Sequence, residues 1–258
     1  MIHEIQEGYV KVEAQSGGIT VIEFFHPQGN SLPAAILNEL AQEIHSAGLQ
    51  KETKVIILRS AGSGAFCAGA SFTELRAIAT AEEGKKFFSG FAHVINAMRK
   101  CPKLIIARVQ GKCVGGGVGL AAAADYAIAL EGADIKLSEL SIGLGPFVVG
   151  PAIQRKLGLS AFSQLAIDAA MWRPADWARR KGLFAELHPN AEDMDESIQR
   201  LANELAHANP EAITELKKIL WEGTENWEEL LQHRAATSGT LVISSFTKAA
   251  LEKLKKKE

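Results

Sequence analysis

Two short runs of branched apolar residues, each followed by a loop rich in glycine and alanine, constrain the fold of this 258-residue chain most strongly. The runs are residues 54–59, KVIILR, and residues 104–109, LIIARV. Apolar runs of this length between polar residues are typical of parallel strands covered on both faces. Between them, apolar residues repeat at helical spacing; these are Phe87, Phe88, Phe91, Val94, Ile95 and Met98. The pattern predicts a strand–helix–strand unit with a right-handed crossover.

The rest of the chain predicts an α/β core followed by helices. Residues 10–13 and 19–25 predict an opening hairpin, Ser31 is predicted to cap the next helix, and residues 126–130 predict a third central strand. From about residue 150 the pattern is helical, over residues 151–157, 161–169, 174–181, 194–207, 210–221 and from 227 onward. We therefore expect an α/β core carrying the site over residues 1–195 and a helical segment over residues 196–258.

Composition excludes several classes of protein. With 47% hydrophobic residues, 22% charged residues and a net charge of -2, the chain is globular and too balanced for a dedicated nucleic-acid binder. Asp125 and several glycines interrupt the longest apolar stretch, residues 114–130, so no membrane partner is expected. The N-terminus does not resemble a signal peptide, and three cysteines form no disulfide framework, so we expect a cytoplasmic protein. The histidines show no metal-ligand spacing, and no metal site is expected.

The two glycine-bearing loops are candidates for binding an anion. They are residues 61–71, AGSGAFCAGAS, and residues 111–119, GKCVGGGVG, and the second runs into a predicted helix. Ligands of α/β proteins bind beyond the carboxyl ends of the strands, and a helix N-terminus offers unpaired N–H groups with a partial positive charge. Backbone donors from both loops could stabilise the oxyanion of a thioester enolate. The alternative is that these glycines only let two backbones pack closely.

Glu139 is the candidate general acid/base. It lies in residues 136–146, KLSELSIGLGP, among apolar neighbours that would raise the pKa of its carboxyl group toward neutrality. Such a group can accept and return a proton at the carbon beside a thioester carbonyl. The alternative is a solvated or helix-capping glutamate.

Residues 117–122, GVGLAA, also satisfy the dinucleotide-binding pattern GxGxx(G/A), which would indicate an NAD(P)-dependent oxidoreductase. In that interpretation a ribose-binding acid should follow the next strand, and Asp125 comes too early for this role. Glu131 remains as a candidate acid. The first loop would have no function, so this interpretation is an alternative rather than the main prediction.

These segments resemble the enoyl-CoA hydratase/isomerase (crotonase) superfamily over nearly the whole chain. Residues 65–71 are similar to its AFxAGAD loop, residues 111–125 to its GxxxGGGxxLxxxxD segment, and residues 137–146 to its xxExxxGxxP segment; residues 179–184 and 209–217 match later motifs. The resemblance implies a spiral of β-β-α units with a helical C-terminal trimerisation region. It also implies an acyl-CoA substrate, no cofactor beyond the coenzyme A of that substrate, and homotrimers or hexamers.

The resemblance also implies residue roles. The backbone N–H groups of Ala70 and Gly116 would form the oxyanion hole, with Glu139 as the catalytic acid/base. The substrate-binding residues would be Ala68, Gly69, Ser71, Gly115, Gly117, Gly119, Pro146 and Phe147. Lys112 would either meet the phosphates of coenzyme A or remain a surface lysine.

Two positions depart from the family pattern. Gly119 stands where the two-glutamate hydratases carry their first acid, and Ser71 stands where an aspartate is common. Because residues 117–120, GVGL, resemble methylglutaconyl-CoA-type hydratases, the leading prediction is a single-glutamate hydratase that adds water to a 2-enoyl-CoA. Residues 145–147, GPF, resemble the Δ3,Δ2-enoyl-CoA isomerases, which need one acid/base, so isomerisation is the first alternative. A non-catalytic acyl-CoA binder is the second.

Overall fold

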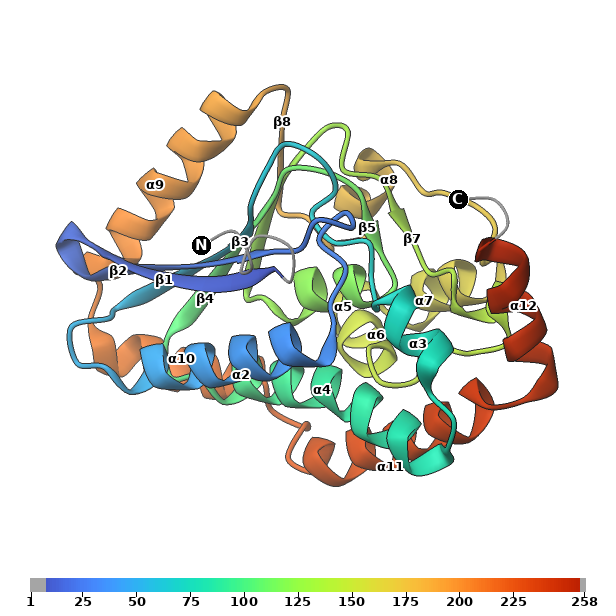
Figure 1. Ribbon diagram of the computed structural model, residues 1–258. Coiled ribbons are helices and arrows are strands. Elements are labelled where there is room, and N and C mark those ends of the chain that lie inside the picture. The colour runs from blue at the N-terminus through green and yellow to red at the C-terminus, as the bar shows by residue number, and fades with distance from the viewer. Residues whose placement is uncertain (1–7, 256–258) are drawn as a thin grey trace.

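The computed structural model describes residues 8–255, apart from the side chain of residue 255. The first seven residues, on which the expectation about a signal peptide rests, lie outside this range. A sheet of six strands forms the centre (Figure 1), in the order β1 (Tyr9–Gln15), β2 (Ile19–Phe25), β3 (Val55–Ser60), β4 (Leu104–Val109), β6 (Tyr126–Leu130) and β8 (Glu186–His188). The opening hairpin β1–β2 is antiparallel and every other pair is parallel. A second, two-stranded parallel sheet joins β5 (Cys113–Val114) to β7 (Ile135–Lys136).

Helices connect the strands and make up most of the C-terminal third. They are η1 (Ser16–Gly18), α2 (Ala34–Leu49), α3 (Phe72–Ala77), α4 (Ala81–Lys100), α5 (Gly116–Ala123), η2 (Glu139–Ile142), α6 (Gly150–Leu157), α7 (Leu159–Ile167), α8 (Ala175–Arg180), α9 (Ala191–His207), α10 (Pro210–Leu220), α11 (Trp227–Val242) and α12 (Ser245–Lys255). The α/β architecture and the C-terminal helices confirm the predicted fold class. Residue 195 lies inside α9, and the division of the chain there stays a prediction. None of the helices described here is long and apolar enough to cross a membrane.

The start of α2 differs from the prediction. The helix begins at Ala34 after Pro33, and Ser31 Oγ instead forms a hydrogen bond with His26 Nδ1 at 2.9 Å. The distant Glu74 provides the capping acceptor, since Ala34 N donates to Glu74 Oε2 at 2.8 Å. Pro33 is suited to the boundary because its fixed φ fits the extended conformation there and it has no N–H to satisfy. The predicted cap therefore lies too early in the sequence.

The central strands β3 and β4 are buried on both faces over most of their length, as the apolar runs predict. On one face, α9 covers the strands in a cluster with Ile19, Val21, Val55, Ile57, Ile106, Ile128, Met194, Ile198, Ala202 and Ala206. On the other face, α2, α4 and α5 pack in the main core, to which Ile22, Phe24, Ile56, Leu58, Ile105 and Ala107 contribute alternate strand positions. Successive side chains of a strand point to opposite faces, so both faces need apolar residues. This arrangement explains why β3 and β4 are apolar without alternation.

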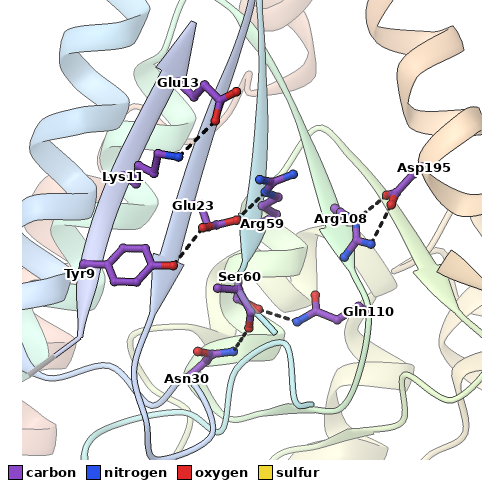
Figure 2. A network of polar contacts seen from close by, with 11 residues as sticks. Tyr9, Lys11, Glu13, Glu23, Asn30, Arg59, Ser60, Arg108, Gln110 and Asp195 are labelled. Atoms are coloured by element: carbon purple, nitrogen blue, oxygen red, sulfur yellow. Dashed lines mark hydrogen bonds and ion pairs between the residues drawn. The ribbon is translucent and has the colours of Figure 1, made fainter. Parts of the chain in front are cut away.

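Polar side chains join the ends of the strands from which the candidate loops leave (Figure 2). Gln110 Nε2 donates to Ser60 Oγ at 2.8 Å and so connects the end of β4 to the end of β3. Asn30, which has a positive φ of 56°, donates from Nδ2 to the carbonyl oxygens of Ala61 at 3.0 Å and Ala65 at 2.9 Å. Asparagine tolerates this left-handed conformation better than most residues. These bonds fix the start of the first loop.

A buried ion pair attaches α10 to the core. Lys217 Nζ lies 2.5 Å from Asp125 Oδ2, and both side chains are at most 5% exposed. Asp125 also accepts from Ile105 N at 2.8 Å and from Trp221 Nε1 at 3.0 Å. The carboxylate therefore connects the end of α5, the start of β4 and the end of α10.

Replacing Lys217 with Met should destabilise the fold by about 3 kcal/mol, because it leaves the Asp125 carboxylate buried without its counter-ion. Urea denaturation followed by circular dichroism measures the loss. The matched control is Lys218→Met, which removes an exposed lysine of the same helix and should cost no more than about 0.5 kcal/mol. Equal effects for the two variants would contradict a stabilising role for the ion pair.

Candidate active site

The two glycine-bearing loops and η2 line one pocket. Of the residues that the sequence singles out, the pocket is lined by Ala68, Gly69, Ala70, Gly115, Gly116, Glu139, Pro146 and Phe147. Three others, Ser71, Gly117 and Gly119, are not among its lining residues. The loops, the acid and the glycine-proline turn, which are far apart in the sequence, thus meet at one place beyond the ends of β3 and β4.

Direct backbone contacts hold the two loops together. Cys67 pairs with Cys113 in a parallel bridge, through Cys67 N donating to Lys112 O at 3.3 Å and Val114 N donating to Cys67 O at 2.9 Å. Gly69 has a φ of 93°, and a Cβ added there would lie 3.0 Å from Val114 O. The backbone conformation and the close approach therefore both favour glycine at 69.

The amide of Ala70 is oriented by its neighbours. Leu32 N donates to Gly69 O at 2.8 Å, and Ser71 N donates to Leu32 O at 3.2 Å. Because the C=O and N–H of a trans peptide point in opposite directions, the Ala70 N–H points away from Leu32. Within the described part of the chain it donates to no backbone acceptor. Ala70 thus offers a free donor to the pocket.

The amide of Gly116 belongs to the first turn of α5. Gly115 O accepts from Val118 N at 3.0 Å and Gly119 N at 3.2 Å, so the N–H of the same peptide, which belongs to Gly116, points out of the helix N-terminus. A Cβ at Gly116 would lie 2.2 Å from Phe91 Cε1. The Phe91 ring therefore packs directly on this backbone, and the side chain itself is buried. A donor in such apolar surroundings stabilises negative charge more strongly than one in water.

Glu139 begins η2 and lies beside the second loop. A Cβ added at Gly115, which has a φ of 50°, would be 2.8 Å from Glu139 Oε1, so the carboxyl group lies directly against this glycine. Glu139 Oε2 is buried and has no hydrogen-bond partner among the described residues. Burial raises the pKa of Glu139 from 4.5 to about 7, with a smaller opposing effect from its own backbone amide. This carboxyl group can therefore be ionised or protonated near neutral pH.

The three predicted residues that do not line the pocket have contacts of other kinds. Ser71 caps α3, since its Oγ accepts from Glu74 N at 3.4 Å. A Cβ at Gly117 would lie 2.5 Å from Cys67 O, and a Cβ at Gly119 would lie 2.6 Å from Val149 Cγ1. These glycines allow close packing, which is the alternative that the sequence leaves open for this segment.

Val149 is a site residue that the sequence analysis misses. It lines the pocket, and its side chain occupies the space into which a side chain at 119 would project. The apolar sequence Phe147-Val148-Val149 indicates a buried segment, but nothing in it shows which glycine it contacts. Among the described lining residues Glu139 is therefore the one carboxylate, and the apolar side chain of Val149 occupies the place that a second acid at position 119 would need.

The C-terminal helices are a second contribution that the sequence does not reveal. Ser238 of α11 lines the pocket. From α12, the fully buried Thr247 donates through Oγ1 to Gly143 O at 3.3 Å, just after η2. Lys248 Nζ of the same helix donates to the carbonyl oxygens of Arg76 and Ile78, at the end of α3. Thus α12 connects the helix that follows the Ala70 loop to the segment that carries Glu139.

Lys112 and the histidines of residues 8–255 are not among the lining residues of this pocket. Lys112 is not a lining residue, and its Nζ lies 4.9 Å from the centre of the Trp172 ring. Its contact with coenzyme A phosphates stays a prediction. Across residues 8–255, no group of three or more His, Cys, Asp or Glu side chains could hold a metal ion.

Comparison with known proteins places this geometry in a family. The family model for enoyl-CoA hydratase/isomerase matches residues 14–253. The human mitochondrial methylglutaconyl-CoA hydratase is 28% identical over 219 residues, which are 83% of this chain and 64% of the human protein. The Arabidopsis thaliana peroxisomal Delta(3,5)-Delta(2,4)-dienoyl-CoA isomerase is 26% identical, over 83% of this chain and 81% of that protein.

A solved structure of an enoyl-CoA hydratase from Bacillus halodurans superposes with a TM-score of 0.86 at 22% identity, covering 95% of this chain and 99% of that one. At this identity the likeness establishes the fold. The family model covers nearly the whole chain, including both glycine-bearing loops and Glu139, and this match establishes membership of the family. The chain belongs to the enoyl-CoA hydratase/isomerase family.

Proposed function

We propose that this protein moves a proton within the acyl group of an enoyl-CoA, converting a 3-enoyl thioester to the 2-enoyl isomer. The observation that supports this most directly is a single carboxyl group, that of Glu139, whose buried Oε2 has no hydrogen-bond partner among the described residues and which lies beside two outward-pointing backbone amides. The thioester carbonyl would lie between Ala70 N–H and Gly116 N–H. Glu139 would face the carbon chain next to that carbonyl.

The proposed reaction needs one base and one oxyanion site. Glu139 removes a proton from C2, and the electron pair passes to the thioester oxygen, where both amides stabilise the enolate. Glu139 then returns the proton to C4 as the double bond moves to C2–C3. The proton stays within the enzyme–substrate pair, so the proposal requires no cofactor beyond the coenzyme A of the substrate.

Val149 favours this reaction over the addition of water. The polar side chains among the lining residues are those of Ser138, Glu139 and Ser238, and of these Glu139 is the one that can act as a general base toward a water. The space that a side chain at 119 would enter holds Val149 instead. A water that attacks C3 would therefore have Glu139 as its one carboxylate partner.

Hydration, the leading prediction from the sequence, is the second candidate. It is favoured by the similarity to methylglutaconyl-CoA hydratase. A non-catalytic acyl-CoA binder is less supported because Glu139 stays in the pocket with a pKa near 7. A dinucleotide site is less supported because Gly117 and Gly119 are covered by Cys67 and Val149. The trimeric or hexameric assembly and the cytoplasmic location stay predictions.

Product analysis tests the proposal directly. Incubated with 3-hexenoyl-CoA, the enzyme should produce 2-hexenoyl-CoA, a product of unchanged mass that liquid chromatography separates from the substrate. Incubated with 2-hexenoyl-CoA, it should produce little of the hydrated thioester, which gains the mass of one water. Faster formation of the hydrated product than of the isomer would reject double-bond migration in favour of hydration.

Replacing Glu139 with Gln should lower turnover of 3-hexenoyl-CoA by at least about a hundredfold, because the amide cannot accept the C2 proton. Binding of the unreactive hexanoyl-CoA, measured by calorimetry, should change little. Glu131→Gln, which neutralises an exposed glutamate elsewhere, is the matched control and should keep full turnover. Near-normal turnover by Glu139→Gln would remove Glu139 from the mechanism.

The raised pKa of Glu139 predicts the pH dependence of kcat/KM. A base must be ionised, so kcat/KM should rise with pH, reach half its maximum near pH 7 and then level off. Stopped assays of 3-hexenoyl-CoA isomerisation between pH 5 and 9 measure this profile. A profile that is flat from pH 5 upward would show that the reactive carboxylate has an ordinary pKa.

Stability provides an independent check of the same pKa. Between pH 4.5 and 7 the folded protein binds a proton at Glu139 that the unfolded chain has lost, so its free energy of unfolding falls as pH rises through this range. In Glu139→Gln the side chain does not titrate, so this fall is absent. The free energy of unfolding of the variant minus that of the parent should therefore rise by at most about 3 kcal/mol between pH 4.5 and pH 8.

A further inference from the structure

We infer that the pocket selects acyl groups that carry no charge and rejects those that carry a free carboxylate. This inference rests on the proposed function, since it assumes that the pocket beside Glu139 holds the acyl chain. It goes beyond that function because the same chemistry at C2 and C4 is possible with either kind of acyl group. The selection would come from the walls of the pocket.

The walls are apolar on several sides. Helices α3 and α4 contribute Phe72, Leu75, Phe88 and Phe91, and the segment after η2 contributes Leu144 and Val149. Most of these side chains also pack in or against the main core, which leaves them little freedom to turn away. Phe88 makes an edge contact with Phe87 at a centroid distance of 5.4 Å. An aliphatic chain would thus be surrounded by carbon atoms.

No described residue that lines the pocket is a lysine, an arginine or a histidine. Arg234 is not among the lining residues, although its Nη1 donates to the backbone oxygen of the lining residue Phe147 at 3.4 Å. The charged group that does line the pocket is Glu139, and an ionised Glu139 would repel an anionic acyl group. A free carboxylate in the acyl chain would therefore lose its hydration on entering the pocket without gaining a counter-ion.

The inferred selectivity distinguishes this chain from the human methylglutaconyl-CoA hydratase in the charge of the acyl group that is bound. The name methylglutaconyl-CoA denotes an acyl group with a free carboxylate, and the human protein of that name is 28% identical to this chain. The apolar walls and the missing cation argue that this chain serves a substrate of different charge. Pocket chemistry, rather than overall similarity, determines which acyl group is bound.

A matched pair of unreactive ligands tests the inference without relying on turnover. Hexanoyl-CoA and adipoyl-CoA have six-carbon acyl chains that end in a methyl group and a carboxylate, respectively. Isothermal titration calorimetry with the full chain at pH 8 should show hexanoyl-CoA binding at least about 30-fold more tightly, given the cost of desolvating a carboxylate. Affinities within about threefold of each other would overturn the inference and leave the proposed function standing. Binding of neither ligand would overturn the proposed function itself.

A designed cation provides a second test. Phe88→Arg places a guanidinium at a half-buried lining position, and it should reduce the preference for hexanoyl-CoA at least about fivefold by pairing with the adipoyl carboxylate. Leu49→Arg adds the same charge at a position that is 68% exposed and outside the pocket, so it should leave the preference unchanged. Circular dichroism verifies that both variants fold. An unchanged preference in folded Phe88→Arg would contradict selection by the charge of the pocket walls.

Discussion

The site depends on one physical constraint, which is that two backbone segments must approach more closely than side chains would permit. The Cys67–Cys113 bridge brings the loops after β3 and β4 together, and Gly69 allows the contact with Val114. Gly115 then leaves room for Glu139, and Gly116 leaves room for Phe91. Each glycine thus removes a different steric conflict. In the proposed mechanism the donors are main-chain amides held in this way, so they need no reorganisation when charge develops on a bound thioester.

The C-terminal helices make this arrangement rigid. Asp125, just beyond the end of α5, is held by Lys217 and Trp221 at the end of α10, so the helix that presents Gly116 is fixed at its far end. Thr247 and Lys248 of α12 connect the Glu139 segment to the end of α3. A segment predicted to serve assembly therefore also completes the site within one chain. Precise placement of Ala70, Gly116 and Glu139 relies on contacts from residues more than 75 positions later in the sequence.

The sequence predicts those features that follow from local patterns. Apolar runs identify β3 and β4, glycine-rich stretches identify both loops, and the apolar neighbours of Glu139 indicate its raised pKa. Contacts between distant side chains were not predictable in this way. Nothing near Gly119 indicates that Val149 fills the space beside it, and nothing near Thr247 indicates that it meets Gly143. The N-terminus of α2 was missed because its capping acceptor, Glu74, lies 40 residues away.

The absence of a cation among the lining residues links reactivity to selectivity. A lysine or arginine beside Glu139 would stabilise its ionised form and lower the pKa of the carboxyl group, which would make the carboxylate a weaker base. The same cation would be the natural partner of a charged acyl group. A pocket with one glutamate therefore cannot easily gain affinity for a carboxylated substrate without losing basicity at Glu139. In the described pocket, apolar walls and Val149 favour a stronger base and an uncharged acyl group together.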